Sequence, residues 1–405
     1  MCLKRILIIS QHYWPENFRI TDIAEGFAAS DIAVDVLCGL PNYPKGEYFA
    51  GYSYWKPRRE ERNGVQIYRA GEVLRRGNSS VRIFLNYISY PLTAPLHLLR
   101  LLGKRYDAVF CYETSPVLML WPAIVWSKLT ATPLTTYVLD LWPENLYSVL
   151  PIQNKALRAI ASGVSHWLYR RSDKLIAMSP ALEKRLQQLA PKCKTTHIPQ
   201  YCEDFYAEDV YDAALCKRFE GRFNIVFAGN FSPAQDLGLL VACAAKLREA
   251  AITDVHFVLV GDGMSREALA ADIAQKGLSS YFTFEGQKPV TDMPAYHTAA
   301  SALFAALAKS DDLGLTVPAK ITGYLAAGKP LLVAIDGEGA RVIREAACGL
   351  TSPAGDADAL YQNILALKNK TPEERAALGK AGRDYYAAHF KRAKLLQELQ
   401  AFILG

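Results

Sequence analysis

The chain has 405 residues, of which 51% are hydrophobic and 21% are charged, a composition that excludes disorder over most of its length. This length favours two domains of about 200 residues each. The eight cysteines are scattered without a CxxC pair, which argues against a zinc site or a disulfide framework. Apolar runs of about 18 residues are absent, so the sequence predicts no transmembrane helix.

The formal net charge of +6 is unevenly distributed. Residues 1–200 carry 25 lysines and arginines against 15 acidic residues, whereas the remainder carries 21 against 25. A basic first half and a slightly acidic second half predict two domains with different partners. Nucleic acid and an anionic membrane surface are both candidate partners of the basic half.

The first half alternates short apolar runs with amphipathic stretches. Residues 5–10 are apolar and β-branched, 20–30 have apolar residues at helical spacing, and 33–40 return to strand character. Further strands are expected within 65–70, 108–112, 133–144 and 174–179. Short buried strands joined by helices predict a parallel sheet with right-handed crossovers.

The pattern restarts after residue 220, with a helix expected at 236–250. Strand-like runs occur at 223–230, 255–263, 281–287, 301–307 and 330–335. The two series predict an α/β chain of two Rossmann-like, doubly wound domains, residues 1–200 and 201–372. Helices expected within 373–405 would cross back toward the first domain.

In an open parallel sheet, ligands bind beyond the carboxyl ends of the strands, so the loops after the expected strands form the candidate site. The motifs in these loops are YWPENFR (13–19), PNYPKG (41–46), DLWPEN (140–145), FAGNFSPAQDL (227–237), VGDG (260–263), FEGQ (284–287) and VPAKITGYLAAGKP (317–330). No GxGxxG follows the first strand and no GxxxxGK[ST] occurs, which argues against a dinucleotide enzyme and a P-loop ATPase.

Taken in order, these motifs resemble those of the retaining GT-B glycosyltransferases of family 4. Within that family the sequence is most similar to bacterial enzymes of O-antigen and exopolysaccharide synthesis, such as the L-fucosamine transferases. The resemblance covers nearly the whole chain. It implies two Rossmann-like domains that face each other across a cleft.

The resemblance also implies the substrates. The second domain would bind the nucleotide of a UDP-sugar donor, and the first would bind a saccharide acceptor linked to polyprenyl diphosphate. An N-acetylated deoxyhexosamine such as L-FucNAc is one candidate for the transferred sugar. No cofactor and no metal are expected, because a site lined by cations can neutralise the donor diphosphate by itself.

Residues 316–330 pose a question of helix electrostatics. Thr316 is a suitable N-cap, Pro318 suits the first turn and Gly328 closes the helix. Lys320 would then lie in the first turn, where the helix dipole disfavours a cation. An exposed lysine of minor cost is one interpretation. The resemblance implies the other, in which the donor diphosphate lies at this helix terminus and Lys320 is a catalytic residue that stabilises the leaving nucleotide.

By the same resemblance, a group of second-domain residues binds the donor. They are Asn230, Gln235, Asp262, Gly263, Gln287, Thr316, Val317 and Lys320. For Asp262 and Gly263, a structural turn after a strand is the alternative.

The sequence departs from the usual pattern of the family in three places. Leu315 and Gly323 occupy the positions of two glutamates that normally contact the donor, so the resemblance does not extend to the donor sugar. Asn230 and residues 233–235 replace a usual arginine and lysine, which leaves backbone N–H groups and amide side chains for the phosphates. Of a usual His-Asp pair only the aspartate is present, as Asp140, because Leu139 replaces the histidine.

Asp140 ends an expected strand and is the second catalytic candidate. A carboxylate there would orient the acceptor or accept the proton of its attacking hydroxyl. The alternative is a turn-forming aspartate that caps the next helix. In retaining enzymes of this fold the leaving phosphate is thought to help take the proton, so Asp140 is not assigned as the base.

Asn17, Arg19 and Glu144 are the residues expected to bind the acceptor. Asn17 and Arg19 follow the first strand, and Arg19 would hold a phosphate of donor or acceptor. A surface salt bridge is the alternative for Arg19. Glu144 lies on the same loop as Asp140.

The segment 81–105 is apolar and aromatic with basic residues at both ends. A buried crossover helix is one interpretation. The other is a helix that lies on a membrane with its basic ends on anionic headgroups. Together with the basic first half, the second interpretation favours an acceptor anchored in lipid, a location at the inner face of the bacterial plasma membrane, and no nucleic-acid partner.

Two other classes of protein remain open. A UDP-sugar 2-epimerase has the same architecture, but it acts on a free nucleotide sugar and needs no basic, membrane-facing domain. A non-catalytic subunit that binds sugar or nucleic acid would also fit the charge distribution. Hydrolysis or transfer of a donor sugar would exclude the subunit.

Overall fold

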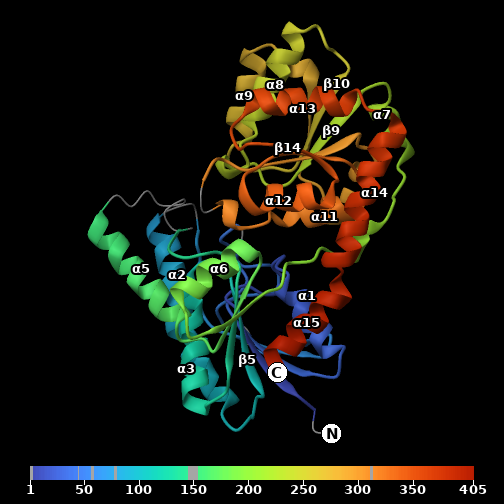
Figure 1. The fold of residues 1–405 in the computed structure, drawn as a ribbon. Coiled ribbons are helices and arrows are strands. Elements are labelled where there is room, and N and C mark those ends of the chain that lie inside the picture. Colours follow the sequence, from blue (N-terminus) through green and yellow to red (C-terminus); the bar gives the residue numbers. More distant parts are fainter. Residues whose placement is uncertain (1–2, 44, 56–58, 77–79, 145–153, 311–312) are drawn as a thin grey trace. The chain divides into compact units, whose positions relative to one another are not determined.

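The computed structural model describes residues 3–43, 45–55, 59–76, 80–144, 154–310 and 313–405. The chain divides into two compact units (Figure 1). Unit 1 comprises residues 1–198 and 396–405, and unit 2 comprises residues 199–395. Of the C-terminal segment 373–405, only the last turns therefore belong to unit 1.

The sheet of unit 1 has eight strands in the order β3-β4-β2-β1-β5-β6-β7-β8. They are β1 (Arg5–Ile9), β2 (Ala33–Cys38), β3 (Arg59–Arg62), β4 (Val65–Arg69), β5 (Ala108–Glu113), β6 (Leu134–Val138), β7 (Lys174–Ala177) and β8 (Lys194–His197). All neighbouring strands are parallel except β3 and β4, which form an antiparallel hairpin. Asn63 and Gly64 make its turn with φ values of 47° and 80°, as a type I′ turn requires.

Helices flank this sheet. They are α1 (Ile20–Ala28), α2 (Ser80–Leu98), α3 (Leu120–Thr130), α5 (Lys155–Tyr169), α6 (Pro180–Leu189) and the end of α15 (Arg392–Leu404). The chain end is fixed to unit 1 because Lys174 Nζ donates a hydrogen bond to Phe402 O at 2.8 Å. Within the described ranges, none of the helices has the length and apolar character needed to cross a membrane.

Unit 2 contains a six-stranded, all-parallel sheet in the order β11-β10-β9-β12-β13-β14. Its strands are β9 (Phe223–Ala228), β10 (Val255–Val260), β11 (Phe282–Gly286), β12 (Ala302–Ala306), β13 (Leu331–Ala334) and β14 (Gly349–Ser352). Its helices are α7 (Ala213–Phe219), α8 (Gly238–Glu249), α9 (Arg266–Gln275), α10 (Met293–Ala299), α11 (Ala319–Ala327), α12 (Gly337–Ala346), α13 (Ala357–Lys368) and α14 (Pro372–His389).

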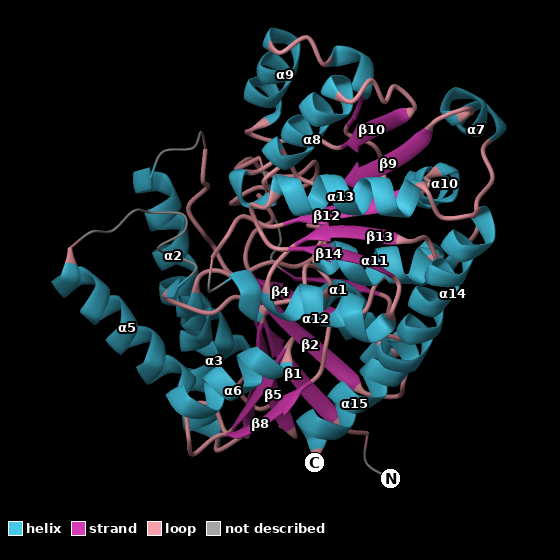
Figure 2. Ribbon diagram, turned by 45° about the horizontal axis from the view of Figure 1, so that its top comes forward, coloured by secondary structure: helices cyan, strands magenta, loops and turns pink. Residues whose placement is uncertain are grey.

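Helices cover both faces of the unit 2 sheet (Figure 2). Along β9, Ile225 and Phe227 point into a core shared with α8, α9 and α13. Val226 and Ala228 point into the opposite core, shared with α10, α11 and α12. Burial of each large apolar side chain contributes about 1.5–3 kcal/mol, so both faces stabilise the sheet. This two-sided burial explains why the strands read as continuous apolar runs.

The expected architecture of two doubly wound α/β domains is confirmed. Each expected strand is present, but three strands were not expected: β3, β8 and β14. The expectation that Thr316 caps the helix of the 316–330 segment is wrong. Pro318 occupies the N-cap position, and the Thr316 hydroxyl is directed to Leu313 O at 3.5 Å. The 3₁₀ turn Leu313–Leu315 precedes the helix and turns Thr316 away from the helix N–H groups.

The segment 81–105 combines features of both interpretations. α2 buries Asn86, Tyr90, Ala94 and Leu98, which share one face at a spacing of four residues. Large apolar side chains on the rest of the helix are exposed, namely Val81, Phe84, Leu85, Leu92 and Leu96. α2 is therefore a crossover helix that still presents an apolar surface to solvent.

Candidate active site

Three loops at the carboxyl edge of the unit 2 sheet are held together by backbone hydrogen bonds. Gly229 N donates to Val260 O and Gly261 N donates to Gly286 O, both at 2.9 Å. Phe231 N donates to Asp262 O at 2.8 Å. The loops that follow β9, β10 and β11 therefore form one structure rather than three independent segments.

Two glycines allow this close approach. A Cβ atom at Gly261 would lie 1.9 Å from Gly229 O, and Gly261 has a φ of +132°, which side chains rarely adopt. A Cβ atom at Gly263 would lie 2.4 Å from Asn230 Oδ1. Asn230 and Gly263, both expected in the donor site, are thus in contact with each other.

Lys320 lies beside these loops, on the second residue of α11. Its Nζ donates a hydrogen bond to Gln235 Oε1 and lies 3.8 Å from the centroid of the Phe227 ring. A Cβ atom at Gly229 would lie only 3.0 Å from Nζ. The lysine side chain therefore does not extend freely into solvent, because it is directed across the end of β9 toward the loop.

Burial determines the electrostatics of Lys320. Removal from water lowers its pKa to about 7. Among the described residues no acidic side chain forms an ion pair with it. An anion that bound beside Nζ would restore the charged form, so this position is suited to an anionic ligand. α11 is itself fixed to β9, since Ala228 N donates to Tyr324 Oη at 2.9 Å.

The remaining expected donor residues have other surroundings. Asp262 is exposed, and its Oδ1 accepts from Gly263 N at 2.8 Å, which is the structural turn that was the alternative. Gln287 is exposed just beyond β11. Val317 is partly buried and packs against the hydrophobic core to which α11 contributes. The structure thus joins Lys320 to Gln235 by a hydrogen bond, whereas in the part of the chain that the structure describes no side-chain hydrogen bond joins Gln287, Thr316 or Val317 to this pair.

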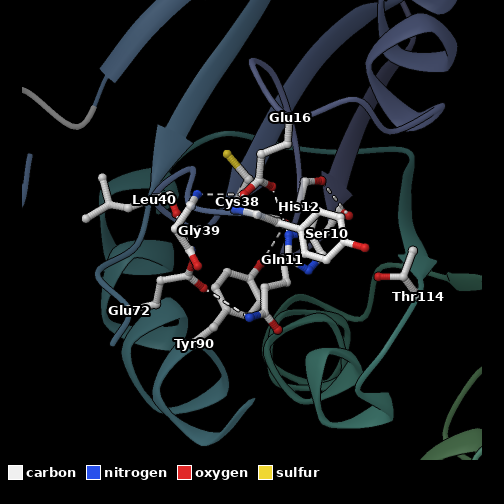
Figure 3. A network of polar contacts seen from close by, with 12 residues as sticks. Ser10, Gln11, His12, Glu16, Cys38, Gly39, Leu40, Glu72, Tyr90 and Thr114 are labelled. Atoms are coloured by element: carbon white, nitrogen blue, oxygen red, sulfur yellow. Dashed lines mark hydrogen bonds and ion pairs between the residues drawn. The ribbon is translucent and has the colours of Figure 1, made fainter. Parts of the chain in front are cut away.

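A buried polar network occupies the carboxyl edge of the unit 1 sheet (Figure 3). His12 Nδ1 and Glu16 Oε2 lie 2.8 Å apart, and both side chains are almost fully buried. Glu16 Oε1 accepts from the backbone N–H groups of Asn42 and Tyr43, both at 2.7 Å. Glu16 therefore ties the loop after β1 to the loop after β2.

Glu72 extends this network. Its carboxylate accepts from Gln11 Nε2 at 3.0 Å and from the side-chain amide of Asn42. Burial, and secondarily the charge of Glu16, raises the pKa of Glu72 well above its usual range. Sequence reasoning assigned no role to His12, Gln11 or Glu72. The only signal was their place in or near loops that follow strands, because burial depends on tertiary packing.

Asp140 belongs to a second cluster, at the ends of β5 and β6. Its Oδ2 accepts from Ser115 Oγ at 2.8 Å, and Ser115 Oγ accepts from Trp142 Nε1 at 3.0 Å. Glu113 ends the neighbouring strand and is fully buried. Burial and the nearby charge of Asp140 raise the pKa of Glu113 well above its usual range, which favours its protonated form. Sequence reasoning missed Glu113 and Ser115.

The three residues expected to bind the acceptor, Asn17, Arg19 and Glu144, have different surroundings in the structure. Asn17 is exposed, and Arg19 is half-buried at the start of α1. Glu144 forms an ion pair with Arg185 of α6 at 3.3 Å. The helix that Asp140 was expected to cap lies outside the described residues. Within the described ranges, no group of three or more His, Cys, Asp or Glu side chains is arranged to hold a metal ion.

The two halves of the chain match two family models. Residues 17–199 match the model described as "Glycosyl transferase 4-like domain", and residues 222–370 match "Glycosyl transferases group 1". No curated protein matches the chain by sequence. Each model lies almost entirely within one unit of the structure, so both units have a family assignment.

Solved structures with the same fold cover nearly the whole chain. Sucrose-phosphate synthase from Thermosynechococcus elongatus aligns with a TM-score of 0.74 at 16% identity and 98% coverage of both chains. HepE from Anabaena, in complex with UDP, aligns with a TM-score of 0.71 at 14% identity, over 98% of this chain and 99% of HepE. WaaG, a glycosyltransferase involved in lipopolysaccharide biosynthesis, aligns at 0.67 and 14% identity over 99% of both chains. These similarities show the GT-B fold.

Proposed function

The chain is a glycosyltransferase of the GT-B type, and we propose that it is a retaining enzyme of family 4 that transfers a sugar from a UDP-sugar to a saccharide linked to polyprenyl diphosphate. The observation that carries this proposal is the position of Lys320 beside the interlocked loops of unit 2. HepE, which has the same fold, has been solved with UDP and with UDP-glucose.

In this proposal the donor diphosphate lies at the N-terminus of α11. The first N–H groups of a helix have no partner within it, and the dipole favours an anion there. Lys320 adds a full positive charge, and Gln235 orients it through their hydrogen bond. Negative charge grows on the diphosphate as the glycosidic bond breaks, so a fixed cation stabilises the transition state more than the ground state.

On the acceptor side, Asp140 orients the attacking hydroxyl. Ser115 fixes the carboxylate of Asp140 through a hydrogen bond, and Trp142 fixes Ser115. Burial is the main cause of the raised pKa of Glu113, and this shift favours the neutral form over a second negative charge beside Asp140. The leaving phosphate accepts the proton of the hydroxyl on the same face of the sugar, as retention requires in this family.

A membrane-bound acceptor is supported by large apolar side chains that are exposed on three helices of unit 1. They are Val81, Phe84, Leu85, Leu92 and Leu96 of α2, Trp121 and Leu129 of α3, and Leu157, Ile160, Val164 and Trp167 of α5. α2 packs against α3, and the rings of Trp121 and Trp167 lie 6.1 Å apart, so the three helices are neighbours (Figure 1).

The charge of these helices favours an anionic lipid surface. α2 and α5 contain no acidic residue, and α5 carries Lys155 and Arg158 beside its exposed apolar stripe. Basic residues next to exposed leucine, isoleucine and tryptophan are typical of helices that lie in a membrane interface. We therefore infer that unit 1 rests on the inner face of the bacterial plasma membrane, where its acceptor is anchored for O-antigen or exopolysaccharide synthesis, and that it does not bind nucleic acid.

The decisive experiment combines binding and transfer. Titration calorimetry with UDP in excess chelator should show binding, because Lys320 and the α11 N-terminus neutralise the diphosphate without a metal. Incubation with UDP-sugars, among them UDP-L-FucNAc, and a polyprenyl-diphosphate saccharide should then yield an extended lipid product. Conversion of the free UDP-sugar to its 2-epimer without transfer would identify an epimerase instead. Absence of nucleotide binding would overturn the assignment of unit 2.

A further inference from the structure

Unit 2 contains a pocket at the opposite edge of its sheet from the donor loops. The pocket has a volume of about 450 Å³, within the usual range for sites of small molecules. Its walls include Ser301, just before β12, and Gly328, just before β13. These are the amino ends of parallel strands, whereas the donor loops follow the carboxyl ends. The two sites are therefore separate.

Cations dominate the lining of this pocket. Lys329, Arg375, Lys380 and Arg383 contribute four positive charges, and Asp209 contributes the only carboxylate of the lining. Asp384, outside the lining, pairs with Lys380 at 2.5 Å. The local balance is thus positive even after both acids are counted. A surplus of cations around one pocket, among them the partly buried Lys329 and Arg375, favours the binding of an anion.

Lys329 is the cation best placed to bind such an anion. Its Nζ donates to Thr298 O at 2.7 Å, and within the described residues this is its only hydrogen bond. An ammonium group has three donors, so two remain for a ligand. Burial lowers the pKa of Lys329, the charge of Asp209 offsets this effect only in part, and the charge of Arg383 lowers the pKa further.

Arg383 connects the pocket to the donor site. Its guanidinium donates to Ala326 O and Ala327 O, the last carbonyls of α11, at 3.2 and 2.9 Å, and to Asp209 Oδ1 at 2.8 Å. The other end of α11 carries Lys320. A ligand that draws Arg383 toward itself would therefore act on the helix that positions Lys320, over about 10 Å of helix.

We propose that this pocket is a regulatory site for a small phosphorylated molecule, whose phosphate contacts Lys329, Lys380 and Arg375 and whose carbon body packs on the alanines and prolines of the lining. Occupation of the site changes the affinity of unit 2 for the donor through α11. This coupling rests on the proposed function, whereas binding in the pocket does not.

The test uses the full chain with hexose 6-phosphate and inorganic phosphate as probes, in the presence of saturating UDP. Calorimetry should show that hexose 6-phosphate binds, and inorganic phosphate should bind more weakly if the carbon body contributes. Lys329→Met should weaken binding at least tenfold. Lys276→Met, which removes a lysine of unit 2 outside the pocket, should leave it unchanged.

Lys380→Glu provides a second variant that preserves folding, because Lys380 is 76% exposed, and it should also weaken binding. The proposal is overturned if Lys329→Met and Lys380→Glu bind the probes as the parent does, or if UDP displaces them. Probe binding without any UDP binding would refute the proposed function and leave the pocket assignment intact. Binding that leaves the UDP affinity unchanged would refute the coupling through α11.

Discussion

Lys320 is the residue on which transfer should depend most strongly. Lys320→Ala should reduce the transfer rate by roughly 10²-fold or more, because a preorganised charge contact to a leaving group contributes about 3 kcal/mol to catalysis. The melting temperature should not fall, since the substitution removes a desolvated cation from the positive end of a helix and introduces the best helix former. Rates and melting temperatures of the same samples give the answer.

Two further variants sharpen this comparison. Lys320→Arg should restore only part of the rate, because a forked guanidinium does not fit the space between the Phe227 ring and Gln235 that holds a compact ammonium. Lys276→Ala, which removes an exposed lysine elsewhere in unit 2, should transfer at the parental rate. Parental activity in Lys320→Ala would exclude the proposed role of the lysine.

The pKa of Lys320 leads to a prediction about protons. With a pKa of about 7, the lysine of the free protein is mostly neutral at pH 8. The diphosphate of UDP raises this pKa again, so binding at pH 8 should take up most of one proton, whereas binding at pH 6 should take up almost none. Calorimetry in buffers of different ionisation enthalpy measures this uptake. Equal uptake at both pH values would show that Lys320 does not face the diphosphate.

The same pKa has a consequence for stability. Between pH 7 and the usual lysine pKa of about 10.4, the unfolded chain binds a proton at this position that the folded chain lacks. The contribution of Lys320 to the free energy of unfolding therefore becomes more favourable as pH rises through this window, and below pH 7 the cost of the buried cation is present in full. The lysine is thus maintained at a cost to folding, which fits a functional residue.

Single residues also show why the sequence revealed only part of the site. Lys320 was recognisable because a first-turn lysine conflicts with the helix dipole. His12 and Glu16 carry no such local conflict, and their significance arises only when the loop after β1 meets the loop after β2. Glu113 lies inside an apolar strand run, where its burial beside Asp140 depends on the pairing of β5 with β6.

At the scale of elements, the strands that the sequence revealed are those buried on both faces. β3 reads as the charged run Arg59–Arg62, and β8 and β14 are short and partly polar, because all three lie at or next to the edges of their sheets. The Asn63-Gly64 turn was the one available signal for β3, since this dipeptide between two runs favours a hairpin. Hydrophobic periodicity therefore identifies central strands more readily than edge strands.

The helices α2 and α5 give a prediction about membranes. The protein should sediment with vesicles that contain anionic lipid and dissociate as salt is raised, because screening weakens the basic contacts. Leu157→Ser with Ile160→Ser should reduce the partition coefficient at least about tenfold, since two aliphatic side chains inserted into the bilayer contribute more than about 1.4 kcal/mol. Both residues are exposed, so folding should be unaffected.

A matched control distinguishes insertion of α5 into the membrane from a general effect of exposed apolar side chains. Met264 is 81% exposed in unit 2, and Met264→Ser should leave vesicle binding unchanged. Equal binding of the parent to neutral and anionic vesicles would contradict the role of the basic residues. Undiminished binding of the Leu157/Ile160 variant would contradict the role of α5.

At the scale of the whole molecule, the two units make separate contributions that a ligand should distinguish. UDP at about 100 times its Kd should stabilise the state that binds it by about 2.7 kcal/mol, which slows amide exchange through unfolding of that state about 100-fold. The three interlocked loops and α11 all belong to unit 2. Hydrogen exchange of the full chain should therefore slow in unit 2, most strongly around 229–231 and 261–263, whereas β1 and β2 should exchange as before.

Uridine, which lacks the diphosphate that Lys320 would contact, should give little protection at the same concentration. Protection confined to unit 1 would contradict the proposal that the nucleotide binds to unit 2. Protection by uridine equal to that by UDP would contradict the proposal that Lys320 contacts the diphosphate.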